Sequence, residues 1–223
     1  SVGGQCRCRS PTESQGRMAP HTWNIFLDLQ CPYSKTTFDL VPALREAYPD
    51  YEISIHLTAN IQHAQAWPAH YSALMVQAAR GAQAYSTYIE ALFANQVKFK
   101  NGDVQLSRAD MDAAFADIAE ECGVLGGDLT KDAFLAKCSD WKQGHVWQAY
   151  GEFKEALALG VFGTPKHIVD GVLLPKTESS WGVADWKSQL ADVPAEARRA
   201  AEAAEGAAKK AIELAARLGS APC

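Results

Sequence analysis

The stretch that decides the fold reads Trp23-Asn24-Ile25-Phe26-Leu27-Asp28-Leu29-Gln30-Cys31-Pro32-Tyr33-Ser34. Its apolar first part predicts a strand at about 23–29. Pro32 then predicts the first turn of a helix, where a missing backbone N–H costs nothing. Cys31 would lie at the N-terminus of that helix, where unpaired N–H groups and the helix dipole favour a thiolate. The stretch therefore predicts a reactive cysteine.

Ser34 stands three residues after Cys31, where a dithiol enzyme carries its second cysteine. The two side chains are about one helical turn apart, so the Ser34 hydroxyl could donate a hydrogen bond to the Cys31 sulfur. A serine cannot displace a mixed disulfide, and release would need an external thiol such as glutathione or another cysteine of this chain. We expect Cys31 to be the nucleophile and Ser34 to tune it.

The other five cysteines are weaker candidates. Cys122 and Cys138 lie at helical spacing with apolar side chains, which predicts buried, unreactive thiols. Cys6, Cys8 and Cys223 lie near the chain ends, and no pattern directs them to the nucleophile. Cys6 and Cys8 also lack the second pair that a zinc site requires, so we expect no metal and no bound cofactor.

Composition excludes several classes of protein. The net charge of −5 and the absence of a Lys/Arg run argue against nucleic-acid binding. No apolar run reaches the about 18 residues that a transmembrane helix needs, so we expect no such segment.

The first residue is Ser rather than Met, which favours a processed chain. We expect an organelle such as the mitochondrion, after removal of a presequence.

Hydrophobic periodicity divides the chain into five parts. The first is rich in Gly, Ser, Arg and Pro and predicts an extended tail. A β-α-β pattern, a helical block and a β-β-α pattern follow. The last part is alanine-rich, with opposite charges four residues apart, and predicts a helix over 194–218. In order, the five parts are 1–20, 21–66, 67–160, 161–193 and 194–223.

We expect an α/β fold in which one four-stranded mixed sheet, flanked by helices, is interrupted by the helical block. The second strand follows from clean alternation over 51–59, and the β-α-β order predicts a parallel pair with a right-handed crossover. Asp170-Gly171 predicts a tight hairpin between the last two strands, at about 166–170 and 172–174. A helix at about 182–191 completes this part.

Three histidines, seven residues apart, carry no metal-binding pattern. They cross a strand, a loop and a proline, so no shared face follows from their spacing. His56 is expected on the polar side of an edge strand. We expect all three to be solvated; they are His56, His63 and His70.

These patterns resemble the DsbA-like branch of the thioredoxin superfamily, in which a helical domain interrupts the thioredoxin fold. The resemblance spans about residues 21–191. The matching pieces are Phe26-Leu27-Asp28-x-x-Cys31-Pro32-Tyr33-Ser34, Ala91-Leu92-Phe93-Ala94-Asn95-Gln96 and Phe162-Gly163-Thr164-Pro165. The chain departs from the dithiol members of this family at Ser34.

The resemblance implies a substrate-binding site beside the nucleophile. Pro165 would follow a cis peptide bond and face Cys31, and the backbone of Thr164 would pair with a bound chain. We assign Pro32 and Tyr33 to the same site.

Three functions stay open. The first is a monothiol thiol–disulfide oxidoreductase that uses Cys31, with glutathione as co-substrate. The second is a non-catalytic accessory subunit of a larger complex, for example at an organellar membrane, with protein partners bound through the tail 1–20 and the helix 194–218. The third is a glutathione transferase of the kappa type, whose members carry serine in place of this cysteine.

Overall fold

The computed structural model describes residues 21–99, 106–138, 140, 142–191, 193 and 210. The tail expected at 1–20 lies outside the described residues, and so does the helix expected at 194–218 apart from Lys210. Within the described part of the chain, no helix combines the length and the apolar character that crossing a membrane requires.

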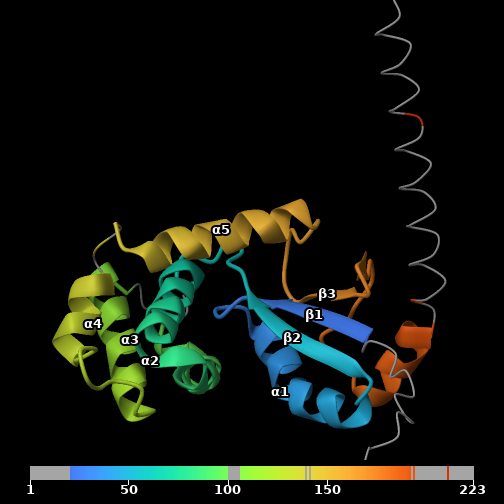
Figure 1. Cartoon of the computed structure of the whole chain (residues 1–223), viewed down its shortest axis with the longest axis horizontal. Coiled ribbons are helices and arrows are strands. Elements are labelled where there is room, and N and C mark those ends of the chain that lie inside the picture. The colour runs from blue at the N-terminus through green and yellow to red at the C-terminus, as the bar shows by residue number, and fades with distance from the viewer. Residues whose placement is uncertain are drawn as a thin grey trace, which may run out of the picture.

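The four described strands form one mixed sheet (Figure 1). β1 (His21–Leu27) lies between β2 (Tyr51–Leu57), which runs parallel to it, and β3 (Lys166–Val169), which runs antiparallel. β4 (Val172–Leu173) pairs with β3 and ends the sheet, so the order is β2-β1-β3-β4. The predicted four-stranded mixed sheet is confirmed.

β1 forms the centre of the core because both of its faces are covered. Trp23, Ile25 and Leu27 are fully buried on one face, against α1 (Pro32–Ala47). On the same side, Trp23 meets Trp186 at 4.8 Å between ring centroids. The second half of β1, Ile25-Phe26-Leu27, is continuously apolar, as expected of a strand segment buried on both faces.

The opposite face of the sheet is covered by α5 (Gly144–Ala158). Figure 1 shows α1 on one side of the strands and α5 on the other. Phe26 of β1 and Ile168 of β3 pack against Ala156 of α5 in a small separate cluster. The sheet is therefore the middle of three layers.

The helical block between β2 and β3 consists of α2 (Ala66–Ala94), α3 (Arg108–Glu121), α4 (Lys131–Cys138) and α5. α2 is not straight: Gly81 has φ 83° and ψ −178°, a backbone conformation that side chains other than hydrogen strongly disfavour. The sequence pattern predicts the helices but not this bend, which places the two halves of α2 against different neighbours.

His167 of β3 is a buried imidazole in the aromatic core. The Trp23 indole N–H donates to His167 Nδ1 at 3.0 Å, and the Trp186 ring lies 4.3 Å from the imidazole. Burial lowers the pKa of His167 to about 3, and the charge of Lys166 acts in the same direction. The imidazole is therefore neutral and accepts the Trp23 hydrogen bond.

Acid should destabilise this core through His167. In the folded chain the pKa of His167 is about 3, whereas a histidine in the unfolded chain has the usual pKa of about 6.5. Between about pH 3 and pH 6.5, the unfolded chain therefore binds a proton that the folded chain does not. The stabilisation is complete above about pH 6.5 and is lost as the pH falls, by at most about 1.4 kcal/mol per pH unit. His167→Gln keeps an acceptor for Trp23 but cannot titrate.

Urea unfolding of both proteins at about pH 7 and about pH 5 measures this effect. The wild-type chain should lose more stability than His167→Gln on acidification. Equal losses would show that His167 is not the responsible group.

Candidate active site around Cys31

Cys31 occupies the N-cap position of α1. β1 ends at Leu27, and the chain turns so that the Cys31 N–H donates to the Asp28 carbonyl at 3.1 Å. The Cys31 backbone is extended, with φ −74° and ψ 122°, and its carbonyl accepts from the Lys35 N–H at 3.1 Å. Pro32 begins the helix. The thiol thus stands where the free N–H groups of the first helical turn point.

The loop before β3 covers the Cys31 thiol. Cys31 is only 3% exposed, and its Sγ donates a hydrogen bond to the Thr164 carbonyl at 3.5 Å. The Thr164–Pro165 peptide bond is cis. The structure therefore brings together three of the residues that the sequence assigns to the site, from segments more than 130 residues apart.

Ser34 is fully buried, but its hydroxyl contacts the turn rather than the sulfur. Ser34 Oγ accepts from the Asp28 N–H at 3.1 Å, and no hydrogen bond joins it to Cys31 among the described residues. Because β1 ends at Leu27, the Asp28 N–H has no strand partner and needs this acceptor. Ser34 therefore fixes the turn that carries the cysteine.

Asp28 is the most heavily hydrogen-bonded side chain of the site. It is fully buried, and its carboxyl accepts from four donors. Oδ1 accepts from the N–H groups of Gln30 and Cys31, at 2.7 and 3.1 Å. Oδ2 accepts from the Asn60 N–H at 2.7 Å and from His63 Nδ1 at 3.0 Å. One carboxyl thus joins the turn before α1 to the loop after β2.

Asn60 extends this network to the loop that covers the thiol. Its side-chain amide donates to Thr164 Oγ1 at 2.8 Å and lies 3.5 Å from His63 Nδ1. Asp28, Asn60 and Thr164 therefore connect the three loops that meet at Cys31. Each hydrogen bond that links Asp28, Asn60 and Thr164 involves a side chain, and the sequence pattern alone does not specify it.

The expectation that the histidines are solvated is wrong for two of the three. His63 bonds to Asp28 with its side chain 22% exposed, and His70 is 2% exposed and bonds to Glu152. His56 is exposed on the edge strand β2, as expected. One signal could have identified His63. It follows β2 closely, and the carboxyl ends of parallel neighbouring strands lie at one edge of the sheet.

Gln96 ties the helical block to the active-site turn. Its amide N–H₂ donates to the carbonyls of Leu29 and Cys31, at 2.8 and 3.1 Å. At the other end of α2, the Gln30 side-chain oxygen Oε1 accepts from the N–H groups of Gln65 and Ala66. These bonds satisfy buried backbone groups at the junction of the two parts of the fold.

Exposed apolar side chains stand on each of the three segments that meet at Cys31. Tyr33 is 62% exposed beside Pro32, Ile61 is 83% exposed beside Asn60, and Phe162 is 81% exposed just before the cis-proline turn. We call Tyr33, Ile61 and Phe162 the apolar rim. Exposed large apolar groups around a reactive atom are typical of a protein-binding surface.

The other described thiols are poor nucleophiles. Burial raises the pKa of Cys138 to about 12, and it also raises the pKa of Cys122. Cys6, Cys8 and Cys223 lie outside the described residues. Among the side chains that the structure describes, no three His, Cys, Asp or Glu groups are arranged to hold a metal ion.

Asp28→Asn should destabilise the chain strongly. Asparagine keeps one acceptor oxygen, so the buried N–H of either Gln30 or Asn60 loses its partner, which costs roughly 1–3 kcal/mol of unfolding free energy. Asp39→Asn, on the exposed side of α1, is the matched control and should change stability little. Urea unfolding of both variants tests this, and equal effects would contradict the assigned role of Asp28.

Solved structures of similar fold come from bacterial thiol–disulfide proteins. A putative protein-disulfide isomerase from Pseudomonas syringae aligns with a TM-score of 0.62 at 18% identity, over 77% of this chain and 93% of its own. BdbD from Bacillus subtilis aligns with a TM-score of 0.59 at 16% identity, over 82% and 90%. DsbA from Chlamydia trachomatis aligns with a TM-score of 0.57 at 12% identity, over 85% and 97%.

No protein-family model matches this chain, and a comparison with curated protein sequences finds no match. At such low sequence identities, the structural likeness establishes the fold and not the activity. The chain has the thioredoxin-like fold with a helical insertion that DsbA-like proteins share, as its sequence predicts.

Proposed function

We propose that Cys31 is the nucleophile of a monothiol thiol–disulfide exchange reaction in which glutathione is the co-substrate. The observation that carries this proposal is the position of the thiol. Cys31 caps α1 and lies 3.5 Å from the carbonyl before the cis-proline, while a buried serine occupies the place of a resolving cysteine. The similar solved structures named as thiol–disulfide proteins support the same reaction class.

The reaction balances without a bound cofactor. The Cys31 thiolate attacks one sulfur of a substrate disulfide, the S–S bond breaks, and the departing thiolate takes up a proton. A glutathione thiolate then attacks the mixed disulfide and releases Cys31 as a thiol. This step leaves the first glutathione bound to the substrate sulfur. A second glutathione then attacks that disulfide in solution, which gives the reduced substrate and oxidised glutathione.

The surroundings of Cys31 suit this sequence of steps. The thiol proton is directed at the Thr164 carbonyl, so loss of the proton frees that carbonyl to accept from another donor, such as the backbone N–H of a bound chain. The free N–H groups of the first turn of α1 favour the negative sulfur. The apolar rim adds contacts that a polypeptide substrate can use.

Trapping the mixed disulfide tests the proposal. Reduced protein treated with oxidised glutathione should gain one glutathione at Cys31, located by peptide mass mapping, and Cys31→Ser should lose that modification. Ser34→Cys places a second thiol one helical turn away, where it can displace glutathione. In that variant, an internal disulfide between Cys31 and the introduced thiol should replace the adduct.

Two results would contradict the monothiol mechanism. One is saturable glutathione binding with no exchange at Cys31, which a kappa-type transferase would show. The other is modification of Cys31 no faster than of a thiol in a urea-unfolded sample at the same pH, since the folded environment would then contribute no activation.

The apolar rim should matter for protein substrates only. Phe162→Ser removes an 81% exposed aromatic group, and we expect reduction of a disulfide-bonded protein to slow several-fold. Exchange with oxidised glutathione, which is too small to span the rim, should be unchanged. Tyr150→Ser, an exposed aromatic on α5, is the control and should alter neither rate. A parallel loss with both substrates would instead indicate damage to the Cys31 site.

Contact with stable protein partners is a second proposal, and it is compatible with the first. The apolar rim supports it, because exposed apolar groups of this size are favourable in interfaces. The segments 1–20 and 194–218, to which the sequence assigns partner contacts, lie outside the described residues apart from Lys210. Size-exclusion chromatography of the full chain from its native source separates an assembly from a compact monomer, and a monomer would count against this proposal.

A further inference from the structure

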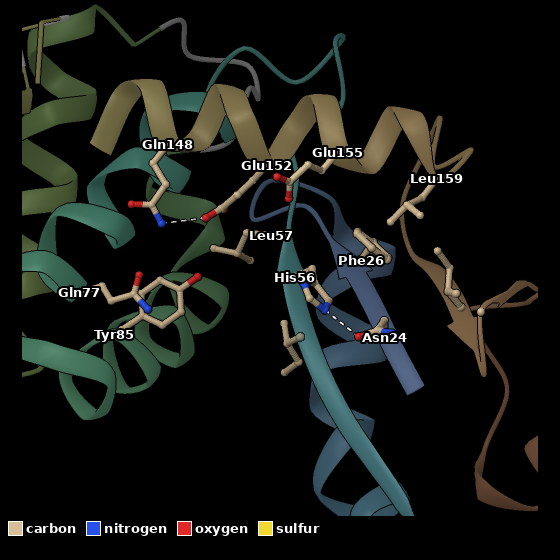
Figure 2. A pocket seen from close by; sticks show the side chains of 13 residues that line it. Asn24, Phe26, His56, Leu57, Gln77, Tyr85, Gln148, Glu152, Glu155 and Leu159 are labelled. Carbon is tan, nitrogen blue, oxygen red and sulfur yellow. Dashed lines mark hydrogen bonds between the residues drawn. The ribbon is translucent and has the colours of Figure 1, made fainter. Parts of the chain in front are cut away.

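A cavity separate from the Cys31 site lies on the face of the sheet opposite α1. It has a volume of about 570 Å³, within the usual range for small-molecule sites. α5 forms one wall, the two halves of α2 form another, and β1 and β2 form the floor (Figure 2). Cys31, Asp28, Asn60 and Thr164 are not among its described lining residues, so the cavity is distinct from the thiol site.

The α5 wall carries two carboxyl groups. Figure 2 shows Glu155 extending from α5 towards β2, and Glu152 extending from the same helix towards Gln148. Glu152 is held in place because its carboxyl accepts from His70 Nε2 at 2.8 Å and from Gln148 Nε2 at 2.9 Å. Burial acts to raise the pKa of Glu152, but these hydrogen bonds outweigh it and hold the pKa below its usual value.

No described side chain that lines the cavity gives these carboxylates a fixed positive charge, and the His70 imidazole that bonds to Glu152 lies outside the lining. None of its described lining residues is a lysine or an arginine. His56 lines the floor, where its ring bonds to Asn24; although it is exposed to solvent on one side, partial desolvation lowers its pKa against the opposing effect of Glu152 and Glu155, away from the charged form. The cavity therefore carries net negative charge.

The rest of the lining combines aromatic and aliphatic side chains with the polar groups of Asn24, Gln77 and Gln148. Phe26 and His56 stack on the floor with ring centroids 4.9 Å apart, and Tyr85 is directed from α2 towards β2 (Figure 2). Among the described residues, neither the Tyr85 hydroxyl nor the Gln77 amide that lies near it in the lining has a hydrogen-bond partner. Both can accept from a ligand without breaking an existing bond.

We propose that this cavity binds a small organic cation: an amine or guanidinium group on an apolar body. The cationic group would lie against Glu152 and Glu155, and the body between Tyr85 and Phe26. Carboxylates give charge-assisted hydrogen bonds to such a group, and aromatic faces attract it through the cation–π interaction. An anion would be repelled by both carboxylates, and a neutral apolar ligand would desolvate them without compensation.

Calorimetric titration with three probes of one shape tests the charge requirement. 2-Phenylethylamine should bind saturably, whereas 2-phenylethanol and 3-phenylpropionate should bind at least about tenfold more weakly, since they lack the charge-assisted contact. Equal affinity for the alcohol would overturn the proposal, and so would the absence of saturable amine binding at low-millimolar concentration.

Variants then locate the site. Glu155→Gln, an exposed change with no described partner to lose, should weaken amine binding about tenfold, whereas Glu46→Gln on α1 should not change it. An equal effect of both would indicate non-specific attraction and overturn the assignment. Cys31→Ser should bind the amine normally, so the thiol-exchange proposal and this one can fail separately.

Discussion

The buried carboxyl of Asp28 is the interaction on which the rest of this site depends. Burying a carboxyl group is costly unless donors surround it, and here four donors converge on it from two loops. Two of them are backbone N–H groups of the turn that leads into α1, and the others belong to the loop after β2. Because the N–H groups of Gln30 and Asn60 would otherwise be buried without a partner, the two loops have little freedom to move separately.

The proposed thiol site and the acidic cavity rest on different parts of the fold. The loops joined by Asp28 lie at the carboxyl ends of β1 and β2, where ligands bind in α/β sheets. The acidic cavity instead depends on the helical block, since α5 and both halves of α2, on either side of the bend at Gly81, line it. The thiol thus stands among loops that follow β1 and β2, whereas residues of these two strands themselves line the acidic cavity.

Much of the fold follows from local patterns, whereas the site follows only in outline. The run from Trp23 to Ser34 specifies a strand and a helix start, because burial of β1 and the fixed φ of Pro32 act within a few residues. The polar network does not follow, because Asp28 and His63 are 35 residues apart and only the folded sheet makes them neighbours. Spacing predicts that Ser34 lies one helical turn after Cys31, but it suggests the Cys31 sulfur as the partner of the Ser34 hydroxyl. The observed partner is the Asp28 N–H, which is free because β1 ends at Leu27.

The contact between Ser34 and the Asp28 N–H also bears on how this chain can evolve. A hydroxyl is a better acceptor than a thiol, so a serine here rigidifies the turn in a way that a cysteine does not. A cysteine at this position would supply a second thiol but would give the Asp28 N–H a poorer acceptor. Selection for a stable turn therefore favours serine here, whereas selection for an internal resolving thiol would favour cysteine.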